Sequence, residues 1–129
     1  MPLQLDTGKK SLEMFFKNWQ VEALSYLWRI QPEGAKSRAV WTNVNESLQG
    51  SISRASIINY LNAMVDEGLL TYTETTGKGG HQRVYYMKYG ETEFKQHIAG
   101  LIILKLLKEY PQETGKALRQ VQENPAPTT

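Results

Sequence analysis

The sequence of 129 residues contains no cysteine and no long apolar run. The absence of cysteine excludes disulfide bonds, thiolate metal sites and thiol catalysis, and it fits a reducing compartment. The longest wholly apolar run near the C-terminus, residues 98–104, is too short to cross a bilayer. The first ten residues, MPLQLDTGKK, lack the apolar centre of a signal peptide. We therefore expect a cytoplasmic protein that does not associate with membranes.

The sequence is also poor in the residues that carry catalysis. Its two histidines, His81 and His97, are far apart and have no carboxylate or cysteine neighbours at ligand spacing. The segment GKGG at 77–80 lacks the spacing and the following helix of a phosphate-binding loop. No pair of carboxylates has a spacing that suggests shared acid–base work. We expect no metal, no cofactor and no enzymatic activity.

Charge of one sign is not in large excess either. Fifteen Lys and Arg against thirteen Asp and Glu give a net charge of +2 and an isoelectric point near 8.8. This balance permits nucleic-acid binding without arguing for it, because the distribution of charge matters more than its sum. The length suits one domain with a short appendage.

Apolar residues at spacings of three and four predict three helices in the first half of the chain. The first follows Asn18 as N-cap and ends at the turn 31–34, and the second runs from about Ser37 to a C-terminal Gly50. The third is capped by Ser53 and ends at Gly68, which should adopt a left-handed conformation. Their apolar faces contain Phe16, Val21, Leu24, Leu27 and Trp28, then Val40, Trp41, Val44 and Leu48, then Ile57, Leu61, Met64 and Val65.

The pattern changes after the third helix. The segments LLTYTET (69–75) and RVYYMKY (83–89) are rich in β-branched and aromatic residues and flank a glycine-rich basic tip, which indicates a β-hairpin. A long helix follows from Glu91 and closes at Pro111, and a shorter helix covers roughly 112–123.

Three helices followed by a hairpin are the order of a winged helix-turn-helix. We therefore expect a mainly α fold with a small β-hairpin wing and C-terminal dimerisation helices. The expected organisation is an N-terminal arm (1–16), a winged-helix DNA-binding domain (17–89), a helical dimerisation region (90–123) and a flexible tail (124–129).

The third helix has the charge pattern of a helix that enters the major groove. Between Ser53 and Val65 it carries one charged residue, Arg54, and its acids begin only at Asp66. Short polar side chains and longer donors at the start of such a helix suit close approach to phosphates and base edges. The expected contacts on this helix are Ser53, Arg54, Ser56, Asn59 and Tyr60, with Asn62 on a similar face.

Two further segments are expected to contact the DNA backbone. The tip of the wing should lie along the phosphates or touch the minor groove, and the start of the second helix should bind phosphates. The expected wing residues are Lys78, His81, Gln82 and Arg83. The expected residues of the second helix are Lys36, Ser37, Arg38 and Thr42, with Asn45 beside them.

The long helix near the C-terminus is apolar around most of its circumference between Ile98 and Leu107. Such a helix needs cover on more than one side, and a second copy of the chain is the simplest cover. A two-fold dimer also matches a palindromic DNA site. The expected interface residues are Phe94, Ile98, Leu101, Ile102, Leu104 and Leu107.

The segments VEALSYLWRI (21–30), SISRASIINYLNAMVDEGLLTYTE (51–74) and RVYYM (83–87) resemble the penicillinase-repressor family of winged-helix regulators, which is MarR-like in the wider sense. The resemblance implies a homodimeric transcriptional repressor that binds an inverted-repeat operator. Copper-responsive relatives sense metal through cysteines, which this chain lacks, and no cleavage site of the antibiotic-responsive relatives can be carried over. An unidentified small-molecule or protein inducer stays open, with no residue that marks its pocket.

An alternative reading is a winged helix that binds protein within a multisubunit complex. This reading predicts an apolar patch on the third helix or the wing. Ile58 and Tyr60 are the residues that suggest one.

Overall fold

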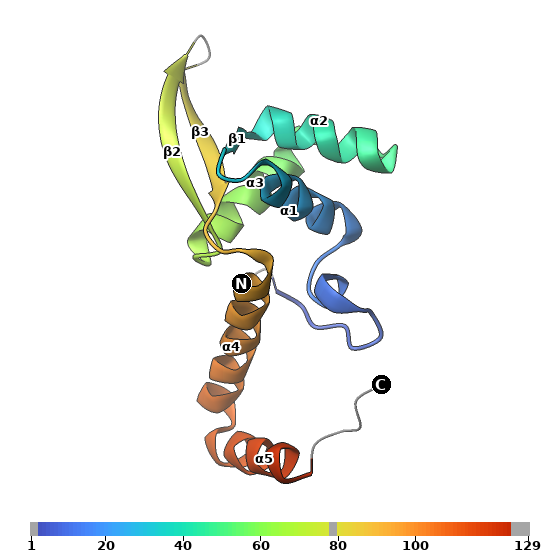
Figure 1. Ribbon diagram of the computed structural model, residues 1–129, viewed down its shortest axis with the longest axis vertical. Helices are drawn as coiled ribbons and strands as arrows, with labels where there is room; N and C mark the ends of the chain where they lie inside the picture. Colours follow the sequence, from blue (N-terminus) through green and yellow to red (C-terminus); the bar gives the residue numbers. More distant parts are fainter. Residues whose placement is uncertain (1–2, 78–79, 125–129) are drawn as a thin grey trace. The chain divides into compact units, whose positions relative to one another are not determined.

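The computed structural model describes residues 3–77 and 80–124. The chain divides into two compact units, one up to Glu91 and one from Thr92 onward. The first unit contains a 3-10 turn, η1 (Ser11–Met14), three helices, α1 (Asn18–Ile30), α2 (Ser37–Leu48) and α3 (Arg54–Asp66), and three strands, β1 (Ala35–Lys36), β2 (Leu70–Gly77) and β3 (Gly80–Met87) (Figure 1). Two helices follow, α4 (Glu91–Glu109) and α5 (Pro111–Glu123). The three helices and the hairpin expected from the sequence are confirmed.

Local signals at the ends of α3 are confirmed. The Ser53 hydroxyl accepts a hydrogen bond from the Ser56 amide at 3.1 Å, as expected of an N-cap. Gly68 has φ +76°, and the amides of Gly68 and Leu69 donate to the carbonyls of Val65 and Met64, both at 2.9 Å. This pair of bonds is a Schellman motif, which satisfies the last carbonyls of the helix.

Two other helix ends differ from the expectation by one residue. The N-cap of α1 is Lys17, not Asn18, because the Gln20 side chain accepts the Lys17 amide at 2.8 Å. The left-handed residue that ends α2 is Gln49, with φ +49°, and not Gly50.

The sheet has three antiparallel strands in the order β1–β3–β2. Leu70 pairs with Met87 and Gly77 with Gly80, and the short β1 adds Ala35 opposite Tyr85. The short strand β1 was not expected from the sequence. It lies close to β3 because of Gly34, where an added Cβ would lie 2.6 Å from the Tyr86 ring and 2.7 Å from the Tyr85 carbonyl. Only glycine fits there without a shift of the backbone.

The core of the first unit lies between the helices and the sheet. Most residues of the expected apolar faces are fully buried: Leu24, Leu27, Val40, Val44, Ile57, Leu61 and Met64. Leu48 is 38% exposed and does not belong to the core. The segment before α1 contributes Leu12 and Phe16, each 5% exposed, so it packs on the domain instead of extending from it as an arm.

The second unit contains most of α4, followed by α5. The Thr114 hydroxyl donates to the Leu106 carbonyl at 3.0 Å, which fixes the turn between the helices. Phe94 and Ile98 are buried, and their assignment to a dimer interface stays a prediction. Leu104 is 64% exposed, and Ile103 and Leu106 are also exposed. No helix within the described residues is long and apolar enough to span a membrane.

Candidate nucleic-acid interface

The turn between α2 and α3 is held by one asparagine. The Asn45 amide nitrogen donates to the carbonyls of Trp41 and Ile52 at 3.0 and 3.1 Å, and its oxygen accepts the Ile52 amide at 2.8 Å. The Trp41 indole donates to the same Ile52 carbonyl at 2.8 Å. Asn45 was expected to bind phosphate, but its hydrogen-bonding groups are used in the turn. Its role is to fix where α3 begins.

Four residues expected to read DNA share the exposed start of α3. Ser53, Arg54, Ser56 and Asn59 are all exposed. The hydroxyls of Ser53 and Ser56 lie 2.8 Å apart in a hydrogen bond. Among the residues that the structure describes, Arg54 forms no ion pair or hydrogen bond through its guanidinium. The start of α3 therefore presents a free cation beside small hydroxyls.

Tyr60, the fifth expected residue, does not lie on this surface. It is 4% exposed, and its ring packs edge-on against Phe16 and Trp19 with centroids 6.1 and 5.3 Å apart. Its hydroxyl donates to the Gln20 carbonyl at 3.4 Å, and burial raises the pKa of Tyr60 well above 10.0. The expectation was wrong because the aromatic ring completes the apolar face of α3.

The wing contains a polar cluster centred on Arg83. The Arg83 guanidinium lies 3.9 Å from the centroid of the Tyr72 ring and donates to the Asn62 side-chain oxygen at 3.1 Å. The Tyr85 hydroxyl donates to the same oxygen at 2.6 Å. Burial raises the pKa of Tyr85, an effect that the Arg83 charge partly opposes. Asn62 and Arg83 were expected to face DNA, but their contacts instead join α3 to both strands of the wing.

The tip of the wing retains two expected residues. His81 is exposed and Gln82 is half-buried, and Thr76 faces His81 across the hairpin. Lys78, the remaining expected residue, lies outside the described residues. Figure 1 shows the β2–β3 hairpin extending beyond the helices of the first unit, as a wing does.

The start of α2 forms a basic shoulder near the base of the wing. Lys36, Arg38 and Thr42 are exposed, and Ser37 is half-buried. Lys36 pairs with Val84 of β3, which ties this shoulder to the sheet. Lys36, Arg38 and Thr42 also line a shallow depression of about 520 Å³ whose rim includes Glu46.

No arrangement typical of a metal site is present in the described part of the chain, where no three His, Asp or Glu side chains gather. The α2–α3 pair with its fixed turn, the preceding α1 and the projecting hairpin define a winged helix-turn-helix domain.

Solved structures provide the comparisons. A protein of Methanosarcina mazei Go1, described as a possible transcriptional regulator, matches with a TM-score of 0.51 at 12% identity, over 81% of this chain and 78% of its own. A proposed transcriptional regulator from Thermoplasma acidophilum gives 0.48 at 18% identity, over 70% and 93% of the two chains. MepR of S. aureus in complex with DNA gives 0.43 at 14% identity, over 87% and 84%.

The likeness to the M. mazei structure supports the winged-helix fold, and its identity is too low to carry function. No family model and no curated protein matches the chain. Membership of the penicillinase-repressor family therefore stays a prediction.

Proposed function

We propose that the protein is a dimeric, sequence-specific DNA-binding transcriptional regulator that acts as a repressor at an inverted-repeat operator. The observation that carries the proposal is the exposed, acid-free start of α3. No side chain among the described residues pairs with Arg54 there, so its guanidinium can contact DNA. A helix of this kind enters the major groove by its N-terminal end.

The positions of the charges on α3 support this orientation. Arg54 is the first residue of the helix and Asp66 the last. At 1.5 Å per residue their backbones lie about 18 Å apart along the axis. This distance exceeds the screening length of about 8 Å at physiological salt, so the acid adds little repulsion at the groove.

The proposed contacts divide into two classes. Arg54 and Asn59 are the side chains with the donors needed to read base edges, while Ser53 and Ser56 allow close approach. The phosphate contacts come from Lys36, Arg38 and Thr42 on the α2 shoulder, with Ser37 beside them, and from His81 and Gln82 on the wing. Lys78 would extend the wing contact.

Dimerisation through α4 is part of the proposal. Leu104 is 64% exposed, Leu106 43% and Ile103 38%, so three large apolar residues within four positions of α4, with Lys105 among them, are exposed to solvent. The half-buried Leu101, Ile102 and Leu107 adjoin it. Apolar surface gathered in this way marks an interaction site, and a second copy would bring two α3 helices to one operator.

The structure weakens the alternative of a protein-binding winged helix. It depended on an apolar patch formed by Ile58 and Tyr60. Tyr60 is buried and Ile58 is half-buried.

The test begins with selection of bound duplexes from a random library, in which a single enriched inverted repeat is expected. Operator affinity is then measured by fluorescence anisotropy for Arg54→Ala and for Arg119→Ala, a control on exposed α5. Arg54→Ala should weaken binding by about 1–3 kcal/mol and relax preference at one base position, because a base contact is lost. Enrichment of no sequence, or affinity that does not fall with salt, would refute the proposal.

A further inference from the structure

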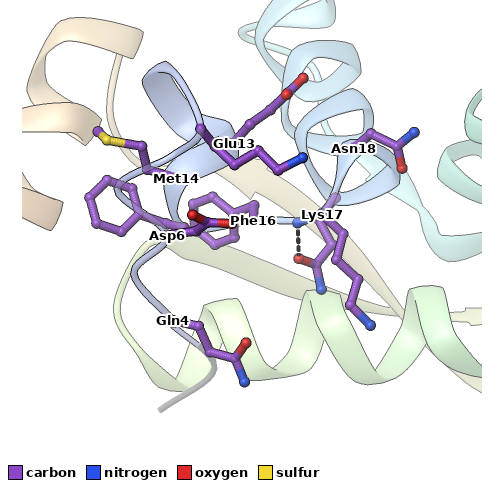
Figure 2. A pocket seen from close by; sticks show the side chains of 10 residues that line it. Gln4, Asp6, Glu13, Met14, Phe16, Lys17 and Asn18 are labelled. Atoms are coloured by element: carbon purple, nitrogen blue, oxygen red, sulfur yellow. Dashed lines mark hydrogen bonds between the residues drawn. The ribbon is translucent and has the colours of Figure 1, made fainter.

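A pocket of about 740 Å³ opens beside the segment that precedes α1, apart from the residues assigned to DNA. Its walls are two runs of chain, which the Asp6 amide joins by donating to the Met14 carbonyl at 2.7 Å. The lining residues are Gln4, Asp6, Lys9, Glu13, Met14, Phe15, Phe16, Lys17, Asn18 and Gln20. Figure 2 shows Gln4 and Asp6 on the first run and Met14, Phe16, Lys17 and Asn18 on the second. The volume is in the range of about 300–1,000 Å³ typical of small-molecule sites.

The lining combines both charges with an aromatic surface. The half-buried Met14 and Phe15 supply apolar area, the buried Phe16 lies behind them, and two carboxylates and two ammonium groups surround this surface. In the described part of the chain, the Glu13 carboxylate and the Lys17 ammonium form no ion pair with another side chain. A ligand with one charge would be repelled by half of these groups. A molecule that carries both charges can satisfy a group of each sign.

We propose that this pocket binds a small zwitterion with an aromatic body, and that α3 senses its occupancy. The aromatic body would lie on Phe15, and the charged ends would meet Glu13 and Lys17. This inference deepens the proposed function by assigning a site for its regulation, and in that respect it rests on the proposed function.

Two residues that line the pocket also contact Tyr60 of α3 directly. Phe16 lines the pocket and also packs edge-on against Tyr60 of α3 with ring centroids 6.1 Å apart. Gln20 lines the pocket too, and its carbonyl accepts the Tyr60 hydroxyl at 3.4 Å. Because packed side chains transmit displacement, a ligand that moves Phe16 or Gln20 moves the helix that carries Arg54.

The binding test uses the free full-length protein and three probes: L-phenylalanine, phenethylamine and 3-phenylpropionate. NMR titration should show L-phenylalanine bound tightest and each singly charged analogue roughly fivefold weaker, because each lacks one exposed charge contact. Glu13→Gln and Lys17→Gln should each weaken the binding of L-phenylalanine by a similar factor. Glu33→Gln and Lys10→Gln, exposed residues outside the pocket, should leave it unchanged.

The coupling test uses the three indole N–H signals of the same protein. Trp19 packs on Tyr60 with centroids 5.3 Å apart, so its signal should shift on saturation with L-phenylalanine. The signals of Trp28 and Trp41, whose indoles donate to Tyr89 and Ile52, serve as internal references and should stay in place.

The inference is overturned if no probe saturates, if all three bind equally, if the pocket variants bind as the controls do, or if Trp19 does not respond. These measurements need no DNA. A protein that binds the zwitterion and shifts Trp19 but binds no duplex would refute the proposed function and leave the pocket assignment intact.

Discussion

Replacing Arg83 by methionine separates two roles that a wing arginine can have. Methionine keeps the apolar stem and removes the guanidinium. In the structure that group donates to Asn62 at 3.1 Å and lies 3.9 Å from the centroid of the Tyr72 ring. If Arg83 holds the wing against α3, its loss should lower stability. If it binds phosphate, its loss should change the salt dependence of DNA binding.

The magnitude follows from these two contacts. A hydrogen bond from a charged donor contributes roughly 1.5–3 kcal/mol, and a partly exposed cation–π contact about 0.5–1 kcal/mol. Arg83 is half-buried, which favours the lower values, and the Asn62 oxygen keeps the Tyr85 hydroxyl at 2.6 Å, so it is not left without a donor. We therefore expect Arg83→Met to reduce the free energy of unfolding by about 2 kcal/mol. Arg83→Lys should recover only part of this, because an ammonium cannot stack and donate in the same planar geometry.

Urea denaturation at a fixed protomer concentration measures the first effect, since dimerisation makes stability concentration-dependent. Anisotropy at several salt concentrations measures the second. Arg38→Met is the matched control, because Arg38 is exposed on the α2 shoulder. It should change stability by less than about 0.5 kcal/mol and reduce the salt slope by roughly 0.9 for each protomer bound. If Arg83→Met has the stability of the wild type and reduces the salt slope of DNA binding as Arg38→Met does, Arg83 is a phosphate contact. The proposal that Arg83 holds the wing against α3 is then refuted.

Three further outcomes are expected. Asn45→Ala should cost about 2–3 kcal/mol in urea denaturation because the Ile52 amide loses its 2.8 Å acceptor, and a change below about 0.5 kcal/mol would contradict the role of Asn45 in the turn. The raised pKa of Tyr60 means that the folded state favours the neutral phenol. The contribution of this phenol to the free energy of unfolding is therefore complete below pH 10.0 and is lost as the pH rises through the pKa of the folded state. Tyr60→Phe should therefore lose less stability than the wild type in an unfolding series above pH 10.0, and parallel curves would argue against a buried phenol. Leu104→Glu, at a side chain 64% exposed, should shift sedimentation towards the monomer while the circular dichroism stays unchanged; a dimer that persists would remove α4 from the interface.

The features predictable from sequence are those that neighbouring residues determine. Ser53 caps α3 through a bond to Ser56, and Gly68 ends it through bonds to the preceding turn. Both interactions lie within a few residues, so composition and spacing identify them. The end of α2 was placed one residue too late because the residue that ends the helix in the left-handed conformation is Gln49, and glutamine does not mark such a position as Gly50 does.

The residues whose surroundings the sequence did not predict are those whose partners are distant in sequence. Tyr60 meets Phe16, and Arg83 meets Asn62, so burial and bonding depend on contacts that no local pattern encodes. A signal for Tyr60 was nevertheless present: with Ile57 and Met64 it follows the three-and-four spacing of a buried face. No comparable signal marked Arg83, since a basic residue in a hairpin is equally suited to solvent, phosphate or an aromatic ring.

The polar residues of the first unit thus divide between holding the fold and facing outward, and this division bears on how strongly one copy could bind. Asn45, Asn62 and Arg83 are engaged within the domain. Among the described residues, the cations left at the proposed interface are Arg54, Lys36 and Arg38. Each phosphate neutralised contributes to affinity through counterion release, so the two proposed phosphate-binding cations in one protomer, Lys36 and Arg38, provide a weak electrostatic attraction. A second protomer doubles the contacts and adds a second recognition helix at a fixed spacing. The low net charge of the chain is therefore consistent with a regulator whose operator affinity depends on pairing through α4.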